Sequence, residues 1–346
     1  MFHYLLSKSA ITRLQVAIIC SVIVIAGAIG GYYWITKERE NVSSLLWKYK
    51  IGDLVVSVAV SEDVVVVGSK DLYALDLNGN LMWKHEMKQN HSGWLDSVAI
   101  VDDTVIAGND HVYAFDLHGN HLWTYEVGVD LGAVVAGEEN IVGGTSLYVF
   151  AIGMNGSLLW KYWKSLSTIP SIAIGNNMVI VGSLHYGIHA LDLNGELLWK
   201  YDISGISSVA VGEVVVVGSP DNGIHALDLN GELLWEYDAE GIIPVAIDSG
   251  ITVAGGYDGV LAFDLNGALL WNASIGDRDL LTTTTACHSI ALSHNKTVVG
   301  TNRHVYAFDL DGNQLLRYKT GRTEVALAED MLIAGSWDGY VYAFSV

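Results

Sequence analysis

From residue 45 to the C-terminus, four kinds of short apolar segment follow one another in a fixed order. A Ser-Val-Ala segment such as residues 57–59 comes first, followed by a β-branched run that ends in glycine, such as residues 64–68. A Tyr-Ala-Leu-Asp segment and a Leu-Leu-Trp-Lys-Tyr segment, as at 73–76 and 197–201, complete the set. Alternating apolar and polar positions of this kind are typical of β-strands with one buried face. The pattern therefore predicts units of four antiparallel strands.

The four-segment unit recurs along the chain. Its clearest copies are IHALDLNGELLWKYDISG from Ile188 and IHALDLNGELLWEYDAEG from Ile224. The tryptophan of the fourth segment is spaced by 36 to 45 residues, with Leu316 at the eighth position; the seven tryptophans are Trp47, Trp83, Trp123, Trp160, Trp199, Trp235 and Trp271. Four-stranded units repeated at this period describe a β-propeller. We predict an all-β domain, an eight-bladed propeller over residues 44–346.

The two ends of the repeat region each carry half a unit. Residues 341–344 form a Tyr-Ala-type segment that stops before its turn, and residues 45–49 form a Leu-Leu-Trp-Lys-Tyr segment with nothing before it. Pairing these two segments leaves no free sheet edge between the first and last blades. We therefore predict that the N-terminal strand and the C-terminal strand close the ring together.

The connection between the third and fourth segments contains Asn-Gly, as at Asn194-Gly195 and Asn230-Gly231. Asn-Gly between two alternating runs predicts a type I′ hairpin turn. The sequence that begins at the aspartate two residues before each turn resembles the start of a calcium-binding loop, but the glutamate that closes a twelve-residue loop is missing. We predict that these aspartates cap the hairpins; they are Asp76, Asp116, Asp192, Asp228, Asp264 and Asp309.

The first forty residues differ from the repeat. Residues 16–35 run for twenty residues without a charge, which is long enough for a helix to cross a bilayer. We predict a cytoplasmic N-terminus at 1–15, a single transmembrane helix at 16–35, a linker at 36–43 and a propeller outside the cytoplasm, either extracellular or periplasm-like. Tyr32, Tyr33 and Trp34 then lie at the outer interface, where amphipathic aromatic residues are favoured.

Two cleavage alternatives remain for the same segment. Ala26-Gly27-Ala28 has the small-x-small form that a signal peptidase accepts. Lys-Ser-Ala at residues 8–10, placed directly before the apolar run, resembles archaeal pilin-like signals. All three interpretations export the rest of the protein.

The charge distribution limits the partners. The protein has a formal charge of −20; residues 1–40 contribute +2, which leaves −22 for residues 41–346. An acidic domain of this kind repels phosphate backbones, so we expect no nucleic-acid partner. Cys20 lies in the apolar run and Cys287 is alone in the propeller, so no disulfide is expected within the exported part. Five glycosylation sequons are consistent with export; they are at Asn41, Asn90, Asn155, Asn272 and Asn295.

The repeat carries a family resemblance. The arrangement Ala-[Leu/Phe]-Asp-x-x-Gly-x-x-x-Trp, complete at 190–199 and 226–235, resembles the tryptophan-docking repeat of the pyrroloquinoline quinone (PQQ) dehydrogenase superfamily. In catalytic members the resemblance implies a quinone over the central channel, a Ca²⁺ site, an aspartate base and often a vicinal disulfide. This protein has no Cys-Cys pair and no long insertions between its segments. It is more similar to non-catalytic eight-bladed members, such as the outer-membrane assembly lipoprotein, and these use the propeller for protein contacts.

Residues that the repeat does not require are the best candidates for binding. They concentrate in the connections that follow the second and fourth segments, which lie on one face of a propeller. Exposed aromatic residues among acidic and hydroxyl groups match protein or carbohydrate recognition. The binding-face candidates are Trp94, Trp163, Tyr186, Asp277, Asp279, His288 and Trp337.

The sequence does not favour a metal site or a catalytic nucleophile. His111, His185, His288 and His304 come from different units at no recognised ligand spacing, so we predict no metal site. Cys287 and His288 are adjacent on a predicted strand and therefore point in opposite directions, which does not suit a nucleophile and its base. His189 and His225, which replace the tyrosine of the third segment, are expected to be structural.

These observations favour a non-enzymatic, membrane-anchored scaffold that binds a protein or glycan partner at the cell surface and needs no cofactor. A quinoprotein-type oxidoreductase is one alternative. It would use PQQ and Ca²⁺ over the central channel, with Asp277, Asp279 and His288 as the polar groups. A structural component of a surface coat or filament is the other alternative.

Overall fold

The computed structural model describes residues 44–87, 94–95, 97–163, 166, 168–241, 243–257, 259–275, 287–293, 296–328 and 330–346. All of them belong to Val42–Val346, the second of two compact units into which the protein divides. The predicted membrane segment at 16–35 and its flanks lie outside these residues. Within the described ranges, no helix has the length and apolar character needed to span a bilayer.

The described residues form eight antiparallel sheets of four strands, each sheet being one blade. Blade 1 consists of β2 (Ser57–Val60), β3 (Val64–Gly68), β4 (Leu72–Asp76) and β5 (Leu81–His85), and blade 2 of β6 (Ser97–Val101), β7 (Thr104–Gly108), β8 (His111–Asp116) and β9 (His121–Glu126). Blade 3 consists of β10 (Leu131–Ala136), β11 (Asn140–Thr145), β12 (Tyr148–Gly153) and β13 (Leu158–Trp163), and blade 4 of β14 (Ser171–Gly175), β15 (Met178–Ser183), β16 (Gly187–Asp192) and β17 (Leu197–Tyr201).

The second half of the ring repeats this order. Blade 5 consists of β18 (Ser208–Val211), β19 (Val215–Ser219), β20 (Gly223–Leu227) and β21 (Leu233–Tyr237), and blade 6 of β22 (Val245–Asp248), β23 (Ile251–Gly255), β24 (Val260–Asp264) and β25 (Leu269–Ala273). Blade 7 consists of β26 (Cys287–Ser293), β27 (Lys296–Thr301), β28 (His304–Asp309) and β29 (Gln314–Lys319), and blade 8 of β30 (Thr323–Ala328), β31 (Met331–Ser336), β32 (Tyr340–Ser345) and β1 (Leu45–Lys50). The predicted eight-bladed propeller is confirmed.

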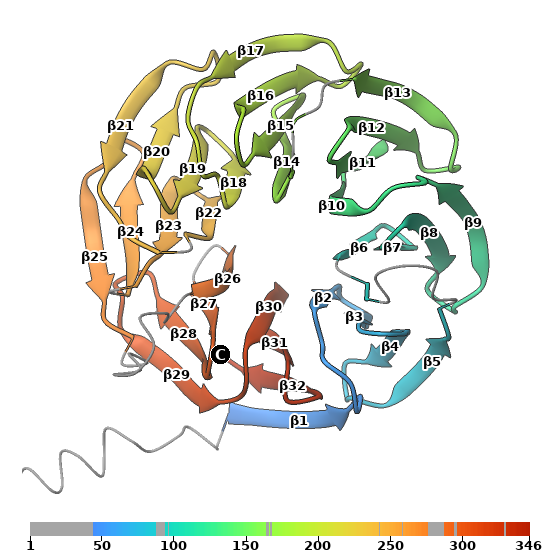
Figure 1. Cartoon of the computed structure of the whole chain (residues 1–346). Coiled ribbons are helices and arrows are strands. Elements are labelled where there is room, and N and C mark those ends of the chain that lie inside the picture. Colours follow the sequence, from blue (N-terminus) through green and yellow to red (C-terminus); the bar gives the residue numbers. More distant parts are fainter. Residues whose placement is uncertain are drawn as a thin grey trace, which may run out of the picture. The chain divides into compact units, whose positions relative to one another are not determined.

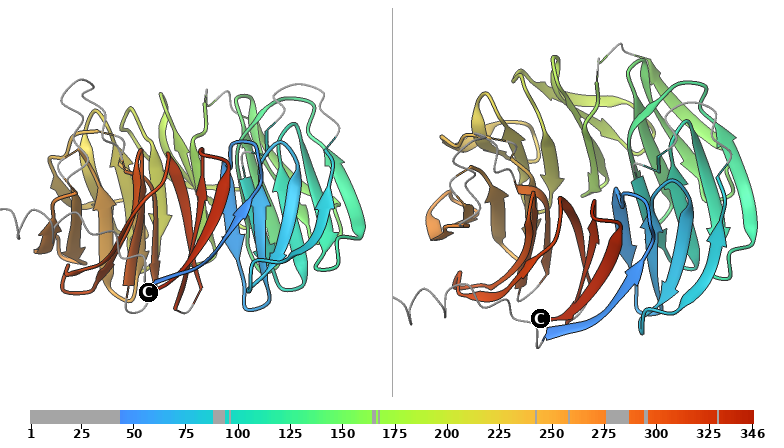
Figure 2. Two further views of the ribbon diagram at one scale, coloured as in Figure 1. Left: turned by 90° about the horizontal axis from the view of Figure 1, so that it is seen from below. Right: turned by 60° about the horizontal axis from the view of Figure 1, so that its bottom comes forward.

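Within the propeller unit, the blades surround a central axis, with the first strand of each blade innermost and the fourth outermost (Figure 1). The strands run between two faces of the ring (Figure 2). We call one the turn face; it carries the connections between first and second strands and between third and fourth strands, such as residues 77–80. We call the other the loop face; it carries the connections between second and third strands and those between blades, such as residues 69–71 and 202–207.

Strand β1 closes the ring. It pairs antiparallel with β32, placing Trp47 opposite Ala343 and Tyr49 opposite Val341. Figure 1 shows β1 as the outer strand of a blade whose other three strands come from the C-terminus. The prediction of closure by the two terminal half-units is confirmed.

The core consists of apolar layers between neighbouring blades. The second strand of each blade is buried almost throughout, as in β3, where all five residues are buried. Val64 and Leu72 of blade 1, for example, form one cluster with Val105 and Phe115 of blade 2. Each sheet therefore has two buried faces, which explains why the second segments read as continuous β-branched runs.

Tryptophan docking joins the outer parts of adjacent blades. Trp199 Nε1 donates a hydrogen bond to Leu229 O of the next blade, at 2.9 Å. Its ring lies so close to Gly231 that a Cβ there would be 2.6 Å from the indole, and Gly231 has a φ of +88°. Glycine is therefore required at this position by both the close approach and the backbone conformation.

The missing eighth tryptophan has a structural reason. In blade 8 the third and fourth strands are β32 and β1, which are the two ends of the repeat region and share no turn. The blade therefore offers no turn glycine on which a tryptophan of blade 7 could dock. Leu316 occupies that position instead and is buried in a cluster with Phe344 and Val325.

The hairpin turns differ from the prediction. Gly79 N–H donates to Asp76 O, and Asp76 N–H donates to Asn80 O. Gly79 has a φ of +82°, but Asn78 is not among the residues with positive φ. A type I′ turn needs positive φ at both central residues, so the predicted type was wrong; the loop is a turn followed by a left-handed glycine. Asp76 Oδ1 accepts from the N–H groups of Asn78 and Asn80, which confirms the capping role.

Each outer strand also contains a bulge that the sequence pattern did not reveal. In blade 4, Ala190 pairs with Trp199 and Leu191 with Leu197, so Leu198 is the extra residue and is 51% exposed. The same irregularity occurs in every blade, always with an apolar extra residue. Bulges interrupt the regular pattern of an edge strand and discourage edge-to-edge pairing with other proteins.

Candidate functional site

The loop face holds the predicted binding residues that the structure describes. Trp94, Trp163, Tyr186, His288 and Trp337 all lie at this face, as the distribution of non-repeating residues predicted. The structure brings His288 and Trp337 together between blades 7 and 8, and it leaves Trp94, Trp163 and Tyr186 on other blades. Asp277 and Asp279 lie outside the described residues.

His288 and Trp337 belong to a polar cluster between blades 7 and 8, which we call the Arg322 cluster: His288, Asn302, Arg322, Glu324 and Trp337. The Arg322 guanidinium carbon lies 4.4 Å from the centroid of the Trp337 ring. Arg322 Nη2 is 4.0 Å from Glu324 Oε1, and His288 Nε2 is 2.6 Å from Asn302 Oδ1. Trp337 is 40% exposed, so the cluster opens to solvent.

Burial changes the protonation of two members of the Arg322 cluster. It raises the pKa of Glu324 to about 7, against the opposing effects of the Arg322 charge and a hydrogen bond with Ser289. It lowers the pKa of His288, and the Arg322 charge acts in the same direction. Near neutral pH, His288 is therefore uncharged and Glu324 is about half protonated. Arg322 supplies the full positive charge of the cluster.

Tyr186 borders a cavity of about 680 Å³ at blades 4 and 5. Polar groups of the wall include His185, Lys200, Asp202 and Asn222. Cavities of this size accommodate small molecules or a protruding side chain. Tyr186 is 55% exposed and forms part of the open rim.

His189 also borders this cavity, but its ring is engaged. It is 3% exposed, and its Nδ1 lies 3.1 Å from Tyr162 Oη of the preceding blade. His225 makes the equivalent contact with Tyr201 at 3.2 Å. The predicted structural role of both histidines is consistent with these contacts between blades.

Among the described residues, Trp163 is the most exposed of the large apolar side chains, at 68%. It ends β13, where its ring packs on Tyr148 at a centroid separation of 4.8 Å. Lys161 Nζ lies 4.3 Å from the Tyr148 centroid and 5.5 Å from that of Trp163. Trp94 is only half-buried, in the connection between β5 and β6. Both residues offer aromatic surface at the loop face.

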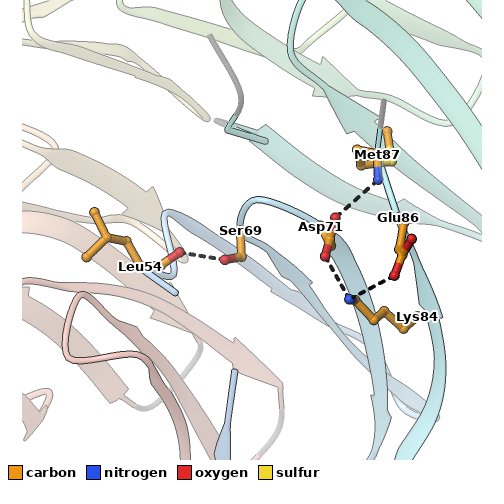
Figure 3. Close-up of polar contacts among 6 residues, drawn as sticks. All are labelled: Leu54, Ser69, Asp71, Lys84, Glu86 and Met87. Atoms are coloured by element: carbon orange, nitrogen blue, oxygen red, sulfur yellow. Dashed lines mark hydrogen bonds and ion pairs between the residues drawn. The ribbon is translucent and has the colours of Figure 1, made fainter. Parts of the chain in front are cut away.

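Blade 1 contains a paired charge on the same face. Lys84 Nζ lies 2.8 Å from Asp71 Oδ2, and Asp71 Oδ1 accepts a hydrogen bond from Met87 N–H at 3.2 Å (Figure 3). Ser69 Oγ donates to Leu54 O at 2.7 Å, which links two neighbouring connections. The hydrogen bond to Asp71 raises the pKa of Lys84. This lysine is therefore committed to an internal partner.

The remaining candidates have simple surroundings. Cys287 is fully buried and packs against Gly255, which is the environment of a small apolar residue instead of a nucleophile. Among the described residues, no three His, Cys, Asp or Glu side chains converge in a way that could hold a metal ion. Asn155 is exposed in a turn and Asn272 is exposed on β25, whereas Asn41, Asn90 and Asn295 lie outside the described residues. Glycosylation at these positions stays a prediction.

Sequence reasoning missed Asn302, Arg322 and Glu324. One signal was available: Glu324 occupies the position that holds serine in five of the eight Ser-Val-Ala segments. A second signal was that all four arginines of the propeller fall within residues 278–322. Neither signal could show that Arg322 stacks on Trp337, since the two residues lie on different connections.

Comparison with known proteins agrees with this architecture. The family described as outer membrane protein assembly factor BamB matches residues 35–162 and 146–346. The computationally designed protein Ika8 is similar in structure, with a TM-score of 0.77 at 20% identity over 88% of this chain and 100% of Ika8.

Two natural propellers are also similar in structure. BamB from Moraxella catarrhalis has a TM-score of 0.69 at 17% identity, and Sqt1 from Saccharomyces cerevisiae has 0.72 at 12%. Each alignment covers 88% of this chain and 99% of the other. No curated protein sequence matches this one. At these identities the structural likeness establishes the fold alone.

Proposed function

Because the protein belongs to the family of PQQ-like propellers described as outer membrane protein assembly factor BamB, we propose that it is a non-catalytic scaffold, anchored in a membrane and exposed outside the cytoplasm, that binds a protein partner through its loop face. The observation that carries this proposal is the contrast between a repeated framework and a non-repeating face. The same docking contacts hold successive blades together, whereas exposed aromatic residues occur singly on the loop face.

The composition of the loop face supports a protein partner. Trp163, Tyr186 and Trp337 are 68%, 55% and 40% exposed. Aromatic residues and arginine contribute most of the binding energy at protein interfaces, and fixed side chains lose little conformational entropy on binding. Trp163 and Trp337 are both held by cation–π contacts, to Lys161 and Arg322. These residues offer pre-organised aromatic contacts at separate points of the loop face, which suits a polypeptide that contacts several blades.

The position of the first strand is compatible with a loop face that is free to bind a partner. β1 begins at Leu45, at the turn-face end of blade 8. The described part of the protein therefore enters the ring at the turn face, and its first strand leaves the loop face uncovered. The apolar run at residues 16–35 and the sequons support an exported, anchored protein.

Site-specific photo-crosslinking tests the proposal. A photoreactive phenylalanine analogue is placed at Tyr186 or Trp337 in the full-length protein, and at Leu198 or Asn230 as controls away from the loop face. Irradiation of intact cells is expected to give discrete protein adducts from the two loop-face positions only. Equal adducts from the controls, or none from the loop face, would overturn the assignment.

The two alternatives make separate predictions. Among the described residues, no three His, Cys, Asp or Glu side chains are placed to hold a metal ion, and we derive no reaction through PQQ. Calorimetric titration of the full-length protein with PQQ and Ca²⁺, followed by a dye-linked alcohol oxidation assay, should show neither saturable binding nor turnover. A coat or filament protein should instead assemble at dilute concentration, which light scattering detects.

A further inference from the structure

Positive charge is distributed very unevenly around the ring. Residues 201–277, which span blades 5 and 6, contain twelve Asp or Glu and no Lys or Arg. The next stretch, residues 278–322, contains six Lys or Arg and three Asp or Glu. An acidic partner is therefore repelled by blades 5 and 6 and attracted by the neighbouring sector, where potentials are complementary. Arg322 lies at the end of this sector, on the loop face.

Arg322 is held in position by two connections. Trp337 N–H donates to Arg322 O at 2.8 Å, and Gly321 N–H donates to Ser336 Oγ at 2.9 Å. The guanidinium then stacks on the Trp337 ring. These contacts join the connection that enters blade 8 to the connection between β31 and β32. A cation fixed in this way loses little freedom when it binds a ligand.

The guanidinium group of Arg322 uses few of its hydrogen-bond donors within the described part of the protein. Nε is buried and has no hydrogen-bond partner in the described part of the protein. The nearest carboxylate in an ion pair, that of Glu324, is 4.0 Å from Nη2, too far for a hydrogen bond. Lys84, by comparison, is 2.8 Å from Asp71 on the same face. With a side chain that is 38% exposed, Arg322 can present Nη donors to a ligand from solvent.

The groups of the Arg322 cluster cancel only part of the charge of Arg322. Glu324 is about half protonated near neutral pH because burial raises its pKa to about 7. His288 is uncharged, and Asn302 contributes a neutral amide. The cluster thus offers one planar cation beside an exposed indole. This chemistry suits a single carboxylate, which guanidinium binds through two parallel hydrogen bonds.

We propose that Arg322, stacked on Trp337, is the recognition site for a carboxylate of an acidic peptide segment, bound at the loop face between blades 7 and 8. The identity of this segment as part of the scaffold's partner rests on the proposed function, but the site itself can be tested without the partner. An aspartate, a glutamate or the C-terminus of the peptide would supply the carboxylate, and the Trp337 ring would cover the adjoining apolar atoms.

Fluorine NMR of the full-length protein labelled with 5-fluorotryptophan provides the test. The Trp337 resonance is identified as the one missing from Trp337→Phe. Titration with acetyl-Ala-Ala-Glu-amide should shift this resonance saturably, whereas the glutamine analogue should leave it unchanged. Arg322→Gln is expected to weaken binding about 10-fold or more, the usual effect of losing a charged hydrogen-bond pair. Arg322→Lys should weaken it less, because lysine keeps the charge but loses the planar fork.

Arg317→Gln is the matched control, since it removes the same charge from β29 outside the cluster. The other tryptophan resonances report whether each variant is folded. The proposal is overturned if the glutamine peptide binds equally well, if Arg317→Gln weakens binding as much as Arg322→Gln, or if inorganic phosphate shifts Trp337 at lower concentration than the acidic peptide. Peptide binding without loop-face crosslinks in cells would leave the site intact and reject the proposed scaffold function.

Discussion

The turn face and the loop face are built from the same strands, yet they differ in how far they repeat. On the turn face, tryptophan, glycine and aspartate recur with the same contacts, as Trp160 on Gly195 and Trp199 on Gly231 illustrate. The loop face differs from blade to blade: it has an aspartate paired with Lys84 in blade 1, a cavity at blades 4 and 5, and a stacked arginine in blade 8. In this propeller, repeated residues hold the ring together, and departures from the repeat mark candidate binding sites.

The largest expected effect comes from removing one docking tryptophan. Trp199→Ala removes the indole that packs on Gly231 and the hydrogen bond to Leu229 O, and should lower the free energy of unfolding by about 3 kcal/mol. Trp337→Ala, on the loop face, should cost less, about 1 kcal/mol, because that side chain is 40% exposed. Urea unfolding of both variants measures the difference. Equal losses would mean that the two faces contribute alike to stability.

A second variant introduces the tryptophan of the repeat at the eighth position, where the protein has a leucine. Leu316→Trp makes the eighth unit match the others, but the position is 1% exposed and blade 8 has no turn on which an indole can dock. Overpacking should therefore lower the free energy of unfolding by about 1–3 kcal/mol. Thermal and urea unfolding would show this loss. A stabilised variant would contradict the explanation given for the missing tryptophan.

The pH dependence of stability tests the loop-face cluster. Glu324 has a folded pKa of about 7, raised above its ordinary value of 4.5, so the folded state retains a proton that the unfolded state releases. Its contribution to stability is fully present below about pH 4.5 and is lost as the pH rises through 7. The loss is on the order of 1–3 kcal/mol. Glu324→Gln should abolish this component in unfolding measured between pH 4.5 and 8, and an unchanged profile would contradict the assignment.

The smallest effect is expected at the hairpin caps. The side-chain hydrogen bond from Asn80 lowers the pKa of Asp76, with help from the backbone N–H groups of Asn80 and Asn78. A lowered folded pKa gives stability that is present above the ordinary value of 3.8 and is lost as the pH falls through the folded value. Asp76→Asn should therefore be slightly less stable than wild type at pH 7, with a difference that shrinks under acid. Acid titration followed by circular dichroism checks this, and a constant difference would contradict it.

Part of the candidate site could be predicted from sequence. The position of Trp337 and His288 on the loop face follows from counting segments, because each connection of a propeller falls on a known face. Arg322 and Glu324 were missed because single charges in a repeat protein usually face solvent. Their significance depends on Trp337, which is contributed by another connection, and on burial that no local pattern reports. Asp277 and Asp279, beyond the described residues, keep their status as predictions.

The sequence by itself determined the blade count, the four-strand order and the closure of the ring, because hydrophobic periodicity and turn residues act over a few positions and repeat eight times. Tertiary structure alone decided the turn geometry at Gly79, the bulge at Leu198 and the stacking of Arg322 on Trp337. The bulge depends on pairing between strands, and the stacking depends on contacts between residues far enough apart that their spacing in the sequence carries no information. Local rules specify the repeated framework, whereas the site arises where non-repeating side chains from different connections meet.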